Sequence, residues 1–173
     1  MKQSLQEEQQ YMLNLLKNEI GQDHVDPLMA NKLILQRKII TWWRCFQFEH
    51  WLILTAKILK DHHLFELMVS SLYQKVNISS YPSDAGEQFV QHILDQAVPE
   101  TIKAVASMEL ALIKLKDEKN KEEYRIFWSQ SPVQLLDALI NGYPYSLLAS
   151  PQTTHEMVLT NSMAGKMVVY ELN

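Results

Sequence analysis

The sequence predicts an α+β fold, with a helical bundle over residues 1–116 and a small β-α-β-β module over residues 122–173. Up to about residue 115, apolar residues recur at the three- and four-residue spacing of helices. The run KDEKNKEE at 116–123 is highly charged, which is typical of an exposed connector. The stretch YRIFW at 124–128 follows it, and its aromatic and β-branched residues favour a strand.

Two helices are expected at the start of the chain. The first spans residues 4–20 and ends at Gly21, because glycine readily adopts the left-handed conformation that ends helices. Asp26 and Pro27 then begin a helical segment that reaches residue 59 and contains no Gly or Pro after Pro27. This segment is apolar on more than one side, and it forms either one long bent helix or two helices that break near Cys45.

Three further helices complete the expected bundle. Asp61 is expected to cap a helix that runs to about residue 75, and a loop follows at 78–82. Ser83 or Asp84 is expected to cap a short helix. Pro99 opens the last helix, which ends before the charged connector.

The C-terminal module combines strands with one helix. Side chains alternate along a strand, so Tyr124, Ile126 and Trp128 share one face of the first strand, and Arg125 and Phe127 share the other. Residues 131–134, Ser-Pro-Val-Gln, match a capping box for a helix that stops at Asn141-Gly142. The segments HEMVLTN and KMVVYEL flank Ser-Met-Ala-Gly, which predicts a hairpin.

Composition excludes several classes of protein. The 173 residues carry a net charge of −4, which does not favour a nucleic-acid binder. The single cysteine, Cys45, excludes an intrachain disulfide and fits a reducing cytoplasm. No apolar run is long enough to span a membrane, and the polar N-terminus does not resemble a signal peptide.

No self-contained active site is apparent. The six histidines show no HExxH spacing, and the four glycines form no phosphate-binding loop. Cys45 lies inside an apolar helix with no base specified beside it, and a buried cysteine is usually inert. We therefore expect no catalytic residue and no metal ligand in this chain.

Two sets of residues are candidates for binding other chains. A small sheet has edges with unpaired backbone groups, to which a peptide can add as a strand, although the pattern alone favours simple packing of the module on the bundle. The cluster around Trp42 is either core or a protein interface, since Trp and Arg are enriched at interfaces. The peptide-binding candidates are Tyr124, Arg125, Ile126, Phe127 and Trp128, with Val168 and Tyr170 on a competing edge; the interface candidates are Trp42, Trp43, Arg44 and Trp51.

Four segments together resemble a known family. They are FELMVSSLYQKV from Phe65, YPSDAGEQFVQHIL from Tyr81, MELALIKL from Met108 and FWSQSPVQLLDAL from Phe127. The chain resembles the MbnC-type partner proteins of multinuclear non-haem iron oxidases, which act in methanobactin biosynthesis and related maturation of ribosomally made peptides.

The resemblance implies an accessory role. The partner would be an MbnB-like TIM-barrel protein that holds the iron, while this chain would hold no cofactor. With dioxygen, the complex would oxidise cysteines of a precursor peptide to oxazolone and thioamide groups. This chain would bind the leader of the precursor through its C-terminal strands. The resemblance implies neither nucleic acid nor a membrane as partner, and it places the complex in the cytoplasm.

Two alternatives stay open. A helix followed by a hairpin also resembles a winged-helix DNA-binding regulator, but the helix PVQLLDALI offers no Lys or Arg to DNA. The second alternative is a structural adaptor that binds no peptide.

Overall fold

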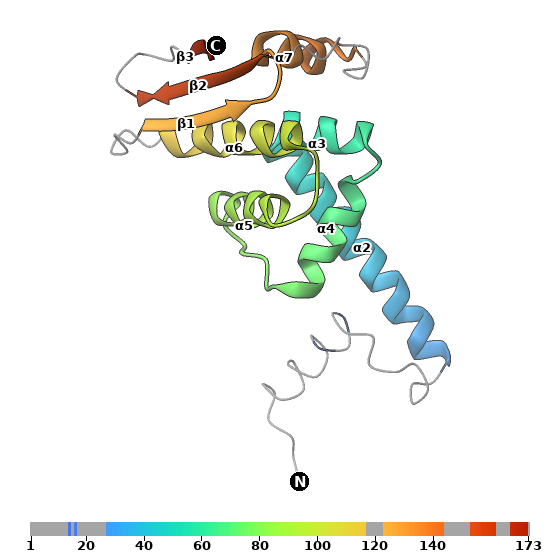
Figure 1. Ribbon diagram of the computed structural model, residues 1–173. Coiled ribbons are helices and arrows are strands. Elements are labelled where there is room, and N and C mark those ends of the chain that lie inside the picture. Colours follow the sequence, from blue (N-terminus) through green and yellow to red (C-terminus); the bar gives the residue numbers. More distant parts are fainter. Residues whose placement is uncertain are drawn as a thin grey trace.

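The computed structural model describes residues 14, 16, 27–116, 123–143, 153–161 and 167–172, and within them it shows an α+β fold (Figure 1). The helix expected at 4–20 lies outside the described residues, apart from Asn14 and Leu16, which are both helical. The described helices are α2 (Pro27–Trp51), α3 (Ile53–Asp61), α4 (Phe65–Lys75), α5 (Pro82–Leu94), α6 (Glu100–Leu115) and α7 (Pro132–Asn141). The strands are β1 (Glu123–Trp128), β2 (Thr154–Thr160) and β3 (Met167–Leu172).

The long apolar segment breaks at Leu52, so the expected break near Cys45 is wrong. Leu52 is fully buried and leaves the helical conformation, with φ −127° and ψ 67°. The break exposes N–H groups at the start of α3. The carboxylate of Glu109 on α6 accepts two of them, from Leu54 at 2.9 Å and from Thr55 at 2.7 Å. An acid distant in the sequence therefore caps α3 and makes the break at Leu52 tolerable.

The turn between α3 and α4 also differs from expectation. Asp61 is the last residue of α3 and does not cap α4. His63 has φ 57°, the N–H of Leu64 donates to Leu59 O at 2.8 Å, and the N–H of His63 donates to Lys60 O at 2.9 Å. This is a Schellman ending, in which a histidine takes the left-handed position that glycine usually occupies. The ending carries α3 through Asp61, and α4 ends at Lys75 as expected.

The start of α5 departs from the predicted cap, whereas α6 begins immediately after Pro99 as expected. Tyr81 occupies the cap position of α5 without a side-chain hydrogen bond, so Ser83 and Asp84 lie inside the first turn and neither is the cap. Pro82 supplies the first residue of the helix, where its missing N–H costs nothing.

The C-terminal module contains the predicted strands, hairpin and helix. The sheet is antiparallel in the order β1-β2-β3, and α7 ends at Gly142, whose φ is 73°. Ser131 occupies the cap position of α7, but its side chain makes no capping hydrogen bond, so the predicted capping box is wrong. The connector at 117–122 and the hairpin turn at 162–166 lie outside the described residues.

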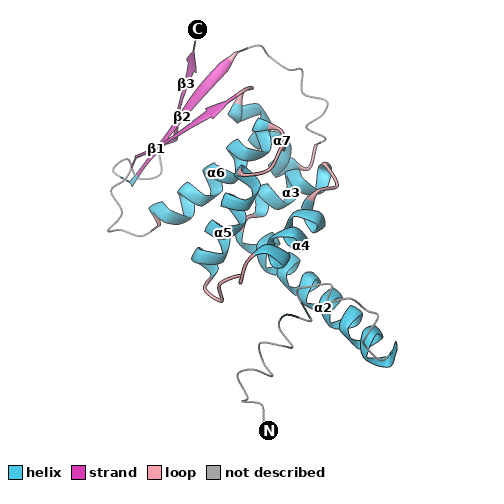
Figure 2. Ribbon diagram, turned by 60° about the horizontal axis from the view of Figure 1, so that its bottom comes forward, coloured by secondary structure: helices cyan, strands magenta, loops and turns pink. Residues whose placement is uncertain are grey.

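One face of the sheet packs on α6, and the core is continuous from the helices into the module (Figure 2). Ile126, Trp128 and Met157 are buried on this inner face, together with helical residues such as Phe89 and Ile102. The alternation of YRIFW predicted this division of β1 correctly, since its burial pattern alternates from Tyr124 onwards. The module is thereby held in a fixed position on the helices.

Replacing Glu109 with alanine is expected to lower the free energy of unfolding by about 1–3 kcal/mol, because two partly buried N–H groups lose their acceptor. Urea denaturation measures this change. Glu109→Gln keeps one acceptor oxygen and should lose less. Glu87→Ala removes only an exposed ion pair with Lys114 and serves as the control. Equal losses for Glu87→Ala and Glu109→Ala would contradict the capping role.

The same carboxyl group should give stability a characteristic pH dependence. Burial raises the pKa of Glu109 above its ordinary value, despite the opposing hydrogen bonds from Leu54 and Thr55. The folded chain then retains the proton more readily than the unfolded chain, so this contribution to stability is full at low pH and is lost as pH rises through the folded pKa. The free energy of unfolding is to be measured for the native chain and for Glu109→Gln across this pH range. The difference, native minus variant, should fall as pH rises above 4.5. A rising difference would show that the hydrogen bonds outweigh burial.

Candidate functional site

The outer face of the sheet brings together four of the predicted peptide-binding residues. Pairing of β1 with β2 and of β2 with β3 sets Arg125 in one row with Val158 and Val168, and Phe127 in the next row with Glu156 and Tyr170. Directly paired residues point to the same face of a sheet. Phe127 and Tyr170 are 63% and 52% exposed, so this face presents aromatic surface to solvent.

Charged groups fix the position of Arg125 on the outer face. Its Nε donates to Glu123 Oε1 at 2.7 Å, and its Nη1 lies 3.4 Å from Glu156 Oε1. The hydrogen bond that Arg125 donates to Glu123 raises the pKa of Arg125, which stays charged in any case. The outer face therefore combines two exposed aromatic rings with an ion-paired cluster of one arginine and two glutamates.

The other three predicted peptide-binding residues lie on the inner face. Ile126 and Trp128 are buried in the core, and Tyr124 packs against it. Their side chains are already engaged, so only their backbone groups remain available for a ligand. Two edges of the sheet carry such groups, the outer edge of β1 and the outer edge of β3.

The two edges differ in their surroundings. In both ribbon views β1 is the strand beside α6, whereas β3 lies farthest from it (Figures 1 and 2). No residue of β3 is fully buried, and Met167, Tyr170 and Leu172 are all exposed. Among the described residues, β3 is therefore the less covered of the two edge strands, and of its residues only Val169 packs its side chain against the core.

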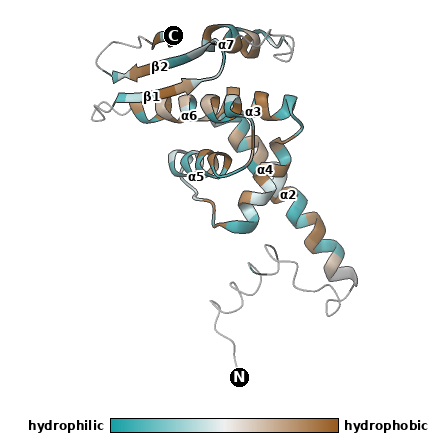
Figure 3. Cartoon of the chain, viewed as in Figure 1, coloured by the Kyte–Doolittle hydropathy of each residue, from teal (hydrophilic) through white to brown (hydrophobic). Residues whose placement is uncertain are grey.

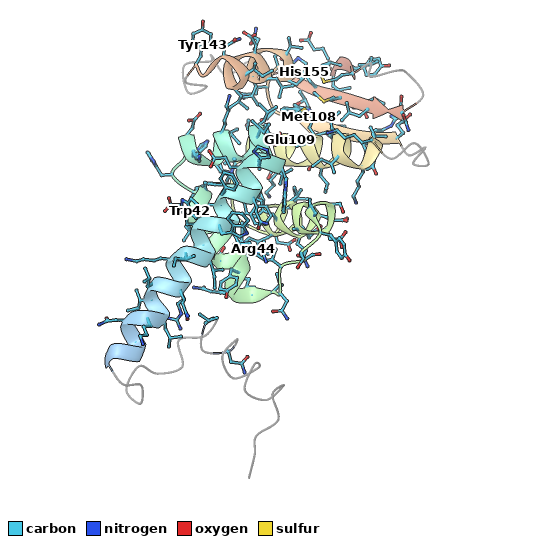
Figure 4. The ribbon with its side chains drawn as sticks, turned by 180° about the vertical axis from the view of Figure 1, so that it is seen from behind. Trp42, Arg44, Met108, Glu109, Tyr143 and His155 are labelled. Carbon is cyan, nitrogen blue, oxygen red and sulfur yellow. The ribbon has the colours of Figure 1, made fainter. Side chains whose placement is uncertain are left out.

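The predicted interface residues are divided between two sides of α2. Trp42 and Trp43 are 65% and 50% exposed and stack with Phe46, at centroid distances of 6.2 and 5.7 Å. Arg44 lies on the opposite side of the helix from Trp42 (Figure 4) and donates to Gln47 and to the carbonyl of Ser79. Arg44 thus ties α2 to the loop after α4 and does not join the exposed aromatic group.

The exposed aromatic group belongs to a longer apolar surface, which we call the α2 stripe. Figure 3 shows hydrophobic residues recurring along α2, including the part that projects beyond the other described helices. Phe46 stacks on His50 with ring centroids 6.0 Å apart, which extends the stripe toward the end of the helix. The stripe consists of Leu35, Ile39, Trp42, Trp43, Phe46 and His50.

A cavity of about 660 Å³ lies where the stripe ends. Trp51, the fourth predicted interface residue, lines this cavity and also packs edge-on against Phe48 in the core. Three exposed apolar residues, Ile53, Leu112 and Met167, form part of its wall. The wall also contains His50, Glu109, Ile113, Leu115, Lys116, Leu159, Thr160 and Asn161.

The titratable groups in the described part of the chain form close pairs rather than a set of ligands for a metal ion. Within the described ranges no three His, Cys, Asp or Glu side chains are placed to share a metal ion. His92 is buried and pairs with Ser71 Oγ at 2.7 Å, and burial lowers its pKa. Ser71 also donates to Met68 O, so this pair acts as a structural link between α4 and α5. None of the described helices combines the length and apolar character that crossing a membrane requires.

Comparison with protein-family models, with curated proteins and with solved structures finds no match. The site must therefore be interpreted from its own residues.

Sequence reasoning missed the cavity and most of the stripe. The cluster from Trp42 to Phe46 was predicted as either core or interface, but its continuation through Leu35 and Ile39 and the exposure of Leu112 were not predicted. The spacing of Leu35, Ile39, Trp42 and Phe46 was a usable signal, because it sets all four on one side of a helix with no polar residue between them on that side.

The thiol of Cys45 is expected to react slowly. Burial, and then the negative charges of Glu66 and Glu49, raise its pKa to about 11 from 9.0. At pH 8 its thiolate fraction is about 100-fold below that of the unperturbed thiol, so alkylation by iodoacetamide should slow by a similar factor. The rate should recover in urea, which provides the control. Alkylation at equal rates in the folded and unfolded chains would show that Cys45 is a reactive thiol after all.

Proposed function

We propose that this chain is a non-catalytic, peptide-presenting subunit of an iron-dependent oxidase complex, similar to the MbnC-type proteins. The observation that carries the proposal is the outer face of the sheet, where Arg125, Phe127, Val168 and Tyr170 lie together beside open strand edges. Peptides that add to a sheet gain main-chain hydrogen bonds from the edge and selectivity from alternate side chains. The ligand would be the leader of a cysteine-containing precursor peptide.

The β3 edge is the better place for the leader. A strand added there would lie beside Val168 and Tyr170 on the outer face and beside Met167 and Val169 on the inner face. The side chains of the added strand that point to the inner face would lie next to the cavity, which Met167 lines. If the strand were added at β1 instead, the same side chains would lie against α6, which already packs there. Burial of partly exposed apolar side chains on both faces favours β3.

The α2 stripe supplies the second binding surface that this function needs. An MbnB-like barrel would hold the iron and react with dioxygen, and it would contact this chain through exposed Trp42 and Trp43. The complex would then oxidise cysteines of the precursor to oxazolone and thioamide groups in the cytoplasm. The leader and the barrel would occupy separate elements, so both can bind at once.

The geometry gives little support to the DNA-binding alternative. A recognition helix needs polar or basic groups on its exposed side, yet the only charged residue of α7 is Asp137. Leu135, Leu136 and Leu139 are buried, which commits the apolar side of α7 to the core.

Leader binding tests the proposal directly. With a fluorescein-labelled leader of the precursor, Tyr170→Ala is expected to weaken binding about tenfold, because an exposed aromatic side chain would be buried in the complex. Phe127→Ala should have a smaller effect if the leader occupies the β3 edge. Fluorescence anisotropy measures both affinities. The matched control is Tyr81→Ala, since Tyr81 is also an exposed tyrosine, at 72% against 52% for Tyr170, but precedes α5, away from the sheet.

The results separate the possibilities. A larger loss for Phe127→Ala than for Tyr170→Ala would move the leader to the β1 edge. No binding by the native chain, with or without its partner, would leave the structural adaptor as the better description.

Metal content tests the division of labour between subunits. Purified alone, the chain is expected to contain no stoichiometric iron by elemental analysis. Co-purified with an iron-binding barrel from the same operon, it should form a coloured complex that oxidises the precursor. Stoichiometric iron in the isolated chain would contradict the proposal.

A further inference from the structure

The α2 stripe and the cavity form one continuous surface. At 100° per residue, the six residues of the stripe fall within an arc of about 100° on α2. His50 belongs to both features, because it stacks on Phe46 and lines the cavity. The exposed side chains of Ile53, Leu112 and Met167 carry the apolar surface from α2 over α3 and α6 to β3. A straight, narrow apolar strip along one helix can pack against the apolar side of a second helix, and the cavity at its end can take a side chain of that helix.

The charges around this surface are mainly positive. Of the four basic residues of α2, Arg37 and Arg44 lie by helical geometry on the side away from the stripe, whereas Lys32 and Lys38 lie on it or beside it; the one acid of α2 is Glu49. By helical geometry Lys32 continues the stripe by one turn and Lys38 borders it. Both are exposed, and neither forms an ion pair with another described residue.

The two acids nearest this apolar surface, Glu49 and Glu109, already form contacts within the chain. Glu49 pairs with Lys60 on α3. Both oxygens of Glu109 accept N–H groups of α3, so this carboxylate does not oppose an incoming acid as a free group would. Lys116, which lines the cavity, is exposed and makes no ion pair with the described part of the chain. The complementary ligand is therefore apolar along one side and acidic at its margins.

We propose that the α2 stripe and the cavity together dock an acidic amphipathic helix of a partner protein, with one large apolar side chain of that helix seated in the cavity. This deepens the proposed function, on which it rests, by giving the chemistry of the partner's contact. An anionic membrane or single-stranded nucleic acid could use exposed aromatics and lysines too. Neither would use a cavity of about 660 Å³ walled by Ile53, Leu112 and Met167, so the observations favour the helix.

The test uses the full chain and two synthetic helical peptides labelled with fluorescein. Both carry Leu at every a and d position and one Phe near an end; Glu flanks the apolar side in the first, and Lys in the second. The native chain is expected to bind the Glu peptide about tenfold more tightly than the Lys peptide. The double variant Lys32→Glu with Lys38→Glu should abolish or reverse this preference. These exposed positions carry no core contacts, so the variant tests charge without endangering the fold.

The cavity requires its own variant. Leu112→Asp is expected to weaken binding of the Glu peptide about tenfold, because it places a charge where the anchor side chain would sit. Leu67→Asp is the matched control, since Leu67 is an exposed leucine on α4 that does not line the cavity. Circular dichroism and urea midpoints show that both variants are folded. If Leu112→Asp proves unfolded, Ile53→Asp makes the same test, because Ile53 is an exposed cavity residue that does not belong to the sheet.

Several outcomes would overturn the inference. They are equal affinity for the two peptides, equal effects of Leu112→Asp and Leu67→Asp, and tighter binding to phosphatidylserine vesicles or to oligo(dT) than to the Glu peptide. Measuring the labelled leader on the same variants separates the two proposals. Equal affinity of the native chain for the two peptides, together with intact leader binding, defeats only this inference, whereas absence of leader binding in the native chain defeats the proposed function.

Discussion

The carboxylate of Glu109 is the link on which the arrangement of the helices depends. It lies on α6 and accepts the N–H groups of Leu54 and Thr55 in the first turn of α3. When the chain leaves the helical conformation at Leu52, backbone N–H groups next to the core lose their partners within the helix. The Glu109 carboxylate supplies the acceptor that they would otherwise lack. Because of the break, α2 and α3 are two separate helices. The end of the α2 stripe lies beside the cavity, which Glu109 also lines.

α6 connects this link to the sheet. It packs against α3 and α5 among the helices and against β1 and β2 in the module, so the same helix fixes both candidate binding surfaces. The side chains of Ile126, Trp128 and Met157 on the inner face of the sheet are buried in the core, so they are not available to a ligand. What stays available is the outer face, the open edges and the projecting part of α2. Among the described residues, no three His, Cys, Asp or Glu side chains are placed to share a metal ion.

The two exposed surfaces differ in the ligand that they suit. The outer face of the sheet has an internally paired cluster of Arg125, Glu123 and Glu156 next to the rings of Phe127 and Tyr170, which suits an extended peptide held mainly by backbone hydrogen bonds. The α2 stripe is a narrow apolar strip beside exposed lysines that form no ion pair within the described part of the chain, which suits a helix. A subunit that presents a peptide to another protein needs both kinds of surface on one rigid core.

Local pattern was enough for features that neighbouring residues control. The alternation in YRIFW gave the two faces of β1, Gly142 ended α7, and the hairpin segments paired as expected, since each depends on residues within one or two turns of chain. The break at Leu52, the histidine in the left-handed position at 63 and the unused cap at Ser131 depended on contacts that spacing does not reveal. Glu109 is more than fifty residues from the donors that it caps, and nothing in its own helix marks that role. Which side of α2 is exposed was likewise settled by the neighbours that cover it, because an apolar helical face looks the same in sequence whether it meets the core or solvent.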